Sequence, residues 1–244
     1  MPNLMRFGTG GGSGSADFPV IGEDFNWTGG DGTYQVTVDS DGDWKIRLLY
    51  SGVFTPLKNM TVDAFLVGAG GGKGAIYTGG GGSGHTTTVK SATLTANTAY
   101  QITVGAAGTN SDGMNISTST DGGTTSAFGA TAAGGKASAN GSNSSKKPGG
   151  AGGSGGGGYN ASGSNGTKSA ASGGTNGSSG TTSTTAGGAG QGTTTREFGE
   201  TGGDLYASGG GDNLTHTIPN SGNGGANGIA PADGIVVIRL HKTA

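Results

Sequence analysis

The sequence predicts a mainly β fold, in which short strands bracket a bundle of packed, left-handed polyglycine-II helices, with essentially no α-helix. Three observations predict this fold class. Glycine accounts for 59 of the 244 residues, whereas Leu, Ile, Val and Phe together account for only 35, too few to fill an ordinary core. The apolar residues gather in short alternating or β-branched runs. The glycines gather in runs between them, separated by polar stretches.

The short apolar runs predict the strands. Alternation of apolar and polar residues in 34–38 and again in 44–50 predicts two half-buried strands, which the Asp- and Gly-containing segment 39–43 would join as a hairpin. The run 235–240 is almost continuously β-branched and predicts a buried strand. Further strands are expected at 62–67, 85–90 and 100–104, with 91–98 as the connection between the last two.

The glycine runs allow two interpretations, a flexible linker or an ordered array. From Gly129 to Glu197, Tyr159 is the only large side chain with apolar bulk. Polyproline-II geometry repeats about every three residues and leaves N–H and C=O groups free to bond to neighbouring chains. Ordering a residue costs about 1–2 kcal/mol and one hydrogen bond returns about 0.5–1.5 kcal/mol, so only a bundle bonded on several sides is stable. Strands on both sides of the glycine runs favour the bundle.

Composition excludes several classes of protein. The net charge of −2 argues against a nucleic-acid partner, which usually requires a basic surface. The chain has no cysteine, so neither a disulfide framework nor a thiolate metal site is expected. It has no run of 18 apolar residues to insert into a membrane, and its start lacks the apolar run of a signal peptide. An intracellular protein, or one that leaves the cell by a route other than secretion, is expected.

No motif predicts catalysis. The glycines of 68–74 miss the spacing of a phosphate-binding loop, and Gly74 stands where the magnesium-binding hydroxyl belongs. The aspartates of 39–43 fit a turn better than a calcium loop. The three histidines are far apart, and Glu197 and Glu200 are interpreted as solvated charges. We therefore expect no enzymatic activity, no catalytic residue, no metal site and no cofactor.

Four segments resemble the glycine-rich adhesin family found at the tips of bacteriophage tail fibres, of the T-even receptor-binding type. They occur in the family's order and cover about residues 50–244. The segments are 51–56 with 62–72, 100–108, 126–129 with 133–135, and 233–239.

The resemblance implies a non-enzymatic adhesin of the virion, in which a sandwich of polyglycine-II helices carries loops that recognise the host surface. The receptor would be an outer-membrane protein or a surface glycan. Residues 1–44, which include the start of the hairpin, are expected to attach to the tail-fibre protein, and 45–244 to form the adhesin domain.

Aromatic and basic residues in the polar connections are the candidate receptor contacts, because such side chains on loops of a rigid scaffold commonly anchor recognition surfaces. For Phe128 a structural role is favoured, whereas for Tyr159 and Tyr206 structural and binding roles are equally supported. The candidates are Lys146, Lys147, Tyr159, Arg196, Phe198, Tyr206 and His216. The candidate connections are 75–78, 109–121, 136–148, 159–172, 193–201 and 212–220.

Two other interpretations remain. One is an ice-binding glycine bundle, slightly supported by the threonine runs 86–88 and 181–185. The other is a disordered, silk-like structural segment.

Overall fold

A computed structural model describes residues 19–38, 44–75, 77–111, 119–140, 148–158, 194–211 and 218–241. Within these ranges the chain forms strands, one short 3-10 helix and no α-helix. The strands are β1 (Phe25–Trp27), β2 (Tyr34–Val38), β3 (Trp44–Leu48), β4 (Gly52–Pro56), β5 (Met60–Val67), β6 (Thr86–Leu94), β7 (Tyr100–Ile102), β8 (Thr125–Ala127), β9 (Ala130–Ala132) and β10 (Ile235–Leu240), and the helix is η1 (Glu197–Gly199).

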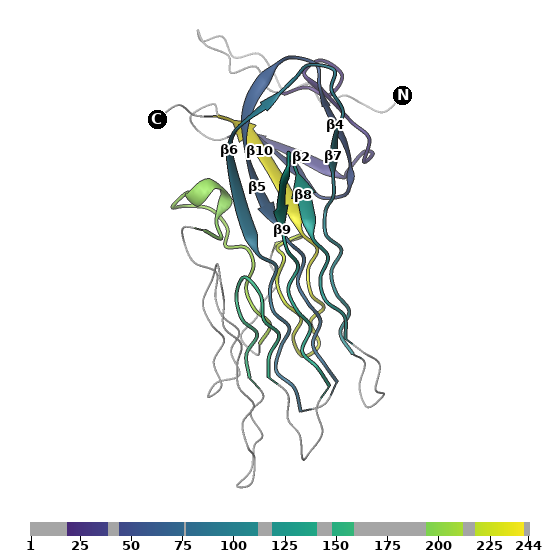
Figure 1. Cartoon of the computed structure of the whole chain (residues 1–244), viewed down its shortest axis with the longest axis vertical. Coiled ribbons are helices and arrows are strands. Elements are labelled where there is room, and N and C mark those ends of the chain that lie inside the picture. The colour runs from purple at the N-terminus through teal and green to yellow at the C-terminus, as the bar shows by residue number, and fades with distance from the viewer. Residues whose placement is uncertain are drawn as a thin grey trace.

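The strands form three antiparallel units at one end of the molecule (Figure 1). A five-stranded sheet has the order β2-β3-β10-β5-β6, a three-stranded sheet has the order β1-β4-β7, and β8 and β9 form a hairpin. The C-terminal strand β10 pairs with β3 on one side and β5 on the other. This central position accounts for its nearly continuous apolar sequence.

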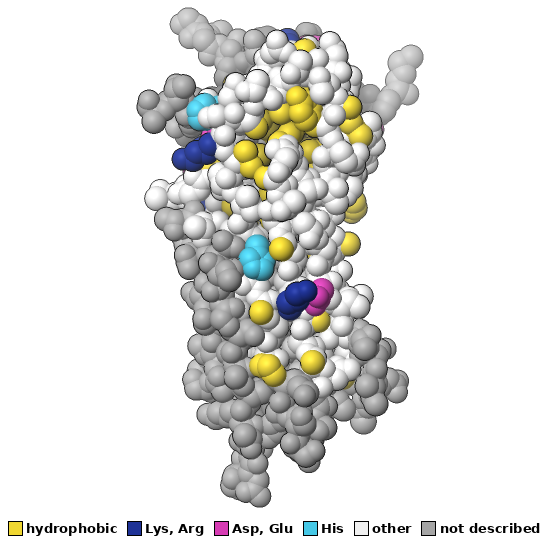
Figure 2. All heavy atoms as spheres, viewed as in Figure 1, with side chains coloured by type: hydrophobic (Ala, Val, Ile, Leu, Met, Phe, Trp, Pro, Cys, Tyr) yellow, Lys and Arg dark blue, Asp and Glu magenta, His cyan; other side chains and the backbone are white. Residues whose placement is uncertain are grey.

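One hydrophobic core lies between these units. Phe54 and Ile102 of the three-stranded sheet pack with Ile46 and Val236 of the five-stranded sheet, all at most 1% exposed. Phe128, for which a structural role is predicted, lies in the β8–β9 turn and packs against rings of this core. Most large apolar side chains of the described chain thus lie at the sheet end. Figure 2 shows apolar side chains gathered there and only scattered ones over the glycine segments.

The predicted strands are confirmed with changed bounds. The pairing of β2 with β3 confirms the hairpin partners, while the turn at 39–43 lies outside the described residues. The connection expected at 91–98 is too long, because β6 continues to Leu94 and pairs with β5 across a bulge. Strands β1, β4, β8 and β9 were not expected. Three of these four have three residues each, too few to show a clear alternation.

The glycine segments extend from the sheets as a lattice of hydrogen-bonded backbones. In segment 79–85, the amides of Gly81 and Gly84 donate to the carbonyls of Gly225 and Gly222, at 2.8 Å each. The partner therefore changes by three residues when the donor changes by three, as expected for the three-residue turn of a polyglycine-II helix. The other two sides of the turn repeat this pattern, with Gly82 and His85 bonding to Lys136 and Ala133, and Gly80 and Ser83 to Gly157 and Ser154.

Segment 79–85 is surrounded on all sides. Its carbonyls accept hydrogen bonds from three further stretches, through the amides of Gly71, Gly150 and Gly210 among others. Six stretches of chain therefore bond to this one. Segment 68–73 also bonds to six stretches, one of which is 79–85 itself. These two segments form the centre of the bundle, and Figure 1 shows parts of the chain distant in sequence running side by side there.

Only glycine fits at most positions of this lattice. A Cβ atom added to Gly81 would overlap the carbonyl oxygen of Gly71, and one added to Gly84 would overlap that of Gly68. The obstructing atoms belong to backbones that are themselves bonded on several sides, so they cannot move aside easily. The absence of a side chain is thus a packing requirement at these positions.

Side-chain amides complete the lattice where no backbone carbonyl is available. Asn110 accepts a hydrogen bond from the amide of Lys73 at 2.8 Å, and Asn140 accepts one from Ala75 at the same distance. Asn223 does the same for the amide of Ser208. Asparagine side chains therefore satisfy backbone donors within the lattice that no backbone carbonyl satisfies.

The expected boundary between residues 44 and 45 falls at the start of β3. On its N-terminal side, β1 pairs with β4, and β2 pairs with β3. Residues 25–38 therefore share both large sheets with the remainder of the chain. Attachment of residues 1–44 to a tail-fibre protein stays a prediction.

The lattice predicts the effect of a single methyl group. Gly81→Ala should lower the free energy of unfolding by roughly 3 kcal/mol or more, because overpacking costs about 1–3 kcal/mol even in side-chain cores, which relax more easily. Gly202→Ala is the control, because an added Cβ there has no atom within 4 Å; its effect should stay within about 0.5 kcal/mol. Denaturant unfolding of both variants measures the difference, and equal stabilities would contradict the lattice.

Candidate functional site

Three predicted connections leave the bundle next to one another at the end remote from the sheets. Ala75 begins the first, and its amide donates to the side chain of Asn140, which lies within the third. Lys73 accepts a hydrogen bond from the amide of Ser111, at the start of the second. Asn110 also donates to the carbonyls of Ala226 and Ile229, so a further turn joins this group. The described flanks of connections 75–78, 109–121 and 136–148 therefore form one cluster, termed here the distal end.

Two other predicted connections are anchored at the opposite end. Connection 193–201 contains η1, which lies against the five-stranded sheet (Figure 1). Connection 212–220 ends at Asn220, whose amide donates to the carbonyls of Leu49 and Gly234, both at 2.8 Å. The described parts of these two connections are therefore held beside the sheet. Connection 159–172 lies outside the described residues.

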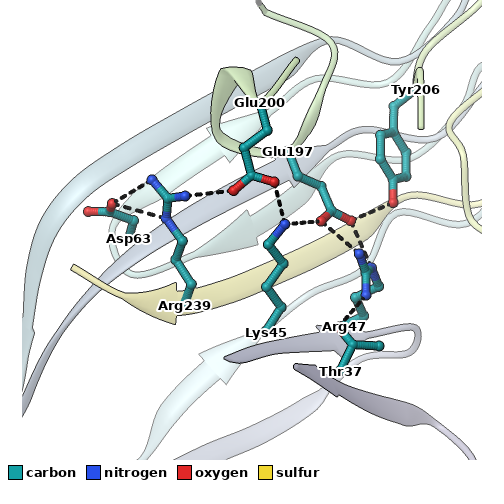
Figure 3. A network of polar contacts seen from close by, with 8 residues as sticks. All are labelled: Thr37, Lys45, Arg47, Asp63, Glu197, Glu200, Tyr206 and Arg239. Carbon is teal, nitrogen blue, oxygen red and sulfur yellow. Dashed lines mark hydrogen bonds and ion pairs between the residues drawn. The ribbon is translucent and has the colours of Figure 1, made fainter. Parts of the chain in front are cut away.

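A buried ionic network fixes η1 to the sheet (Figure 3). Arg47 of β3 binds Glu197 with two hydrogen bonds, of 2.7 and 2.8 Å, and Tyr206 donates to the same carboxylate at 2.7 Å. Lys45 lies between Glu197, at 3.3 Å, and Glu200, with which it also pairs. The interpretation of both glutamates as solvated charges is wrong for Glu197, which is 5% exposed and paired with cations from a strand about 150 residues earlier.

The network continues across the sheet through Arg239 of β10. Its guanidinium donates to Glu200 at 2.8 Å and reaches Asp63 of β5 at 3.3 Å. Asp63 is 2% exposed and also contacts His241 Nδ1 at 2.6 Å. Each buried carboxylate in the described chain thus has at least one cationic or hydrogen-bonding partner, as burial of charge requires.

Phe198 and Tyr206, two of the candidate receptor contacts, have structural surroundings. The Phe198 ring lies over the Arg239 guanidinium, 4.1 Å from ring centroid to Cζ, and near Phe65. Its backbone has a φ of 54°, an uncommon conformation for a bulky residue that is held here by these contacts. Tyr206 is 1% exposed and packs against Phe65. In this conformation Tyr206 cannot contact a receptor, so the structural alternative holds for it.

The remaining candidates divide into two groups. Arg196, which immediately precedes η1, is partly exposed beside the sheet. Lys146, Lys147, Tyr159 and His216 lie outside the described residues. The structure therefore brings Arg196, Phe198 and Tyr206 together at the sheet, and it places no described candidate at the distal end.

Burial and pairing oppose each other in setting the pKa values of the network. Burial alone would raise the pKa of Glu197, but the hydrogen bonds and charge of Arg47, with Tyr206 and Lys45, lower it below its usual value. Asp63 behaves likewise, with His241 as the principal partner that lowers its pKa against the effect of burial. Burial raises the pKa of Tyr206, and the neighbouring Glu197 carboxylate adds to this effect. Glu197 and Asp63 are therefore ionised and Tyr206 is protonated at neutral pH.

Ser91, His241 and Asp63 have the composition of a hydrolytic triad but not its geometry. The Ser91 Oγ lies 3.0 Å from Nε2 and 3.3 Å from Nδ1 of His241, so it is almost equidistant from the two ring nitrogens. A hydroxyl bonded along the in-plane lone pair of Nε2 would lie much farther from Nδ1. The hydroxyl therefore sits over the ring face, where the imidazole cannot accept its proton. Sequence reasoning did not connect these residues, which come from three separate strands or strand ends.

No group of three metal-ligating side chains occurs among the described residues. In the same residues, no helix is both long and apolar enough to cross a membrane.

These features define a class of protein in which a β-sandwich forms one end and a polyglycine-II bundle extends from it. The model of the glycine-rich domain family matches residues 50–241, and the chain belongs to this family. No protein with a curated description matches the chain. The match starts within the β3–β4 connection, so β1, β2 and β3 lie before the matched residues.

Removing the Glu197 charge should destabilise the fold. Glu197→Gln leaves Arg47 without its ionised partner in a largely buried site, which costs about 3–5 kcal/mol for fully buried pairs. The control is Lys58→Gln, which breaks the pair with Asp24 where the Lys58 side chain is 67% exposed; it should cost less than about 1 kcal/mol. Denaturant unfolding at pH 7 measures both, and similar losses would show that the η1 network contributes little.

The network also predicts acid sensitivity. A carboxylate with a pKa lower in the folded than in the unfolded state stabilises the fold above its unfolded pKa, and this contribution disappears as the pH falls through the folded pKa. The ordinary values are 4.5 for glutamate and 3.8 for aspartate, so stability should fall as the pH drops below 4.5. Glu197→Gln should show a shallower fall, because glutamine does not titrate. Unfolding curves from pH 7 to lower pH test this, and an unchanged slope would contradict the assignment.

Proposed function

We propose that this protein is a non-enzymatic receptor-binding adhesin at the tip of a phage tail fibre. The polar connections at the distal end bind a receptor on the host cell, either an outer-membrane protein or a surface glycan. The sheet end, with the N-terminal region, attaches to the tail-fibre protein. The protein is then a component of the virion, and membership of the glycine-rich family is compatible with this role.

The observation that carries the proposal is the convergence of three connections at the end of a stiff bundle. Their flanks are tied to each other by the Asn110 and Asn140 side chains and by the Lys73–Ser111 backbone bond. A lattice bonded along the full length of its segments can hold such connections in place while their sequences vary, because the bonding uses backbone atoms. This is the arrangement that a recognition surface on a constant scaffold requires.

The candidate contacts are revised accordingly. Lys146 and Lys147 belong to connection 136–148 and remain primary candidates, and Tyr159 and His216 remain candidates from the sequence alone. Arg196 and Phe198 belong to the η1 connection, and we assign Phe198 to scaffold packing. Tyr206 is withdrawn because it is buried.

The proposal predicts where host specificity lies. Exchanging 75–77, 112–118 and 141–147 for the corresponding segments of a relative with another host, with the buried Thr78 kept, should change which cells the purified protein binds. The expected result is at least a tenfold change in affinity, about 1.4 kcal/mol, with unchanged thermal stability. The control exchanges residues 201–203, which lie beside the sheet. Binding of fluorescently labelled protein to host cells measures the effect; unchanged binding after all three distal exchanges would contradict the proposal.

A further inference from the structure

The outer face of the five-stranded sheet is incompletely covered next to its β2 edge. A bay of about 410 Å³ lies there, with a floor formed by β2, β3 and β10. Its walls come from two segments that cross the sheet, one containing Asp204 and the other Ile218 and Pro219. This volume is in the range that small-molecule sites occupy. The bay is at the sheet end, away from the distal connections.

Two polar side chains that line the bay have no partner within the described part of the chain. Gln35 and Asp204 are both exposed, and neither side chain makes a hydrogen bond or ion pair to a described residue. They differ in this respect from the neighbouring Arg47, which binds Glu197 and Thr37. A carboxylate and a carboxamide together can accept several hydrogen bonds and donate two.

The charge of the bay disfavours anionic ligands. Arg47 is the only cation among the described residues that line it, and the bidentate bond to Glu197 neutralises that charge. Asp204 adds an uncompensated negative charge. A phosphate, sulfate or carboxylate would therefore meet repulsion without a free cation to bind it.

Tyr206 also lines the bay, but it is 1% exposed and its hydroxyl is bonded to Glu197. The remainder of the lining is aliphatic. Leu49, Ile218, Pro219 and Ile235 present carbon surfaces next to the two polar groups. A ligand that fits this lining has one apolar face and several neutral hydroxyl groups. Pyranose sugars combine these features, since their axial C–H bonds form an apolar face and their hydroxyls both donate and accept hydrogen bonds.

We propose that this bay binds a neutral pyranose unit of a glycan. Asp204 accepts hydrogen bonds from two sugar hydroxyls, Gln35 accepts one and donates one, and the sugar ring lies on Leu49, Ile218 and Pro219. The site is independent of the distal connections and of the proposed adhesin function, and it gives the sheet end a carbohydrate-binding activity of its own. Because the bay is open to solvent, the affinity for a single sugar is weak, on the order of 1–10 mM.

Saturation-transfer difference NMR on the full chain tests the proposal. The probes are free glucose, galactose, mannose, N-acetylglucosamine and rhamnose, with N-acetylneuraminic acid as an anionic probe. At least one neutral sugar should receive saturation, whereas the anionic sugar should not. Asp204→Ala and Gln35→Ala should each weaken binding about tenfold, the effect of losing one or two hydrogen bonds.

Glu23→Ala is the matched control, because it also removes one exposed carboxylate but lies outside the bay. It should bind the sugar as the unchanged chain does. Thermal melting of all three variants shows whether they are folded, and their exposed positions predict no loss of stability. Absence of transfer to every neutral sugar, or equal binding by Asp204→Ala and Glu23→Ala, would overturn the proposal.

These measurements use purified protein and free sugars, so their outcome is separate from that of cell binding. Loss of cell binding after exchange of the distal connections, with sugar binding retained, would support both sites. Sugar binding without any cell binding would support the bay and contradict the adhesin function.

Discussion

The hydrogen bond between glycine backbones is the interaction on which this structure depends. A glycine helix alone cannot recover the entropy that its ordering costs, because each net hydrogen bond returns less than that cost or about the same amount. Segments 68–73 and 79–85 overcome this by bonding to six neighbouring stretches each. The same crowding excludes every side chain at positions such as Gly81. The stability of the bundle and its high glycine content therefore both follow from the close packing of its backbones.

The sheet end determines which glycine segments become neighbours. The hydrogen bonds of the lattice cannot do so, because they join backbones that are alike in every segment. Strand β5 pairs with β10 in an unbroken register and with β6 across a bulge, and all three strands lead directly into or out of glycine segments. The side-chain core between the sheets thus sets the starting positions of those segments. The η1 network adds a second tie, because Glu197 and Glu200 join β3 and β10 across the face of the sheet. Specificity of folding comes from side chains, and rigidity of the bundle comes from backbone.

The candidate site was predictable only in part. Polar connections between glycine runs are evident in the sequence, and three of the six do meet at the distal end. The position of connection 193–201 against the sheet was not predictable. The local sequence around Glu197 and Phe198 is compatible equally with a solvated and with a buried glutamate. Its partners Lys45 and Arg47 alternate with apolar residues on β3, which is also the usual pattern of a solvated strand face. Nothing local distinguishes that face from one covered by a distant segment.

The sequence by itself determined the fold class and the principal strands and favoured a glycine lattice over a flexible linker, since composition and periodicity restrict what a chain can bury. It also predicted that 235–240 is a buried strand, because a nearly continuous β-branched run is typical of strands buried on both faces. The tertiary structure alone decided which segments are neighbours, which connections share an end, and that Tyr206 and Glu197 are buried. Those outcomes depend on contacts between residues 150 or more positions apart, such as Arg47 with Glu197 and Leu49 with Asn220. Glycine runs, having no side chains, leave no trace of their partners in the sequence.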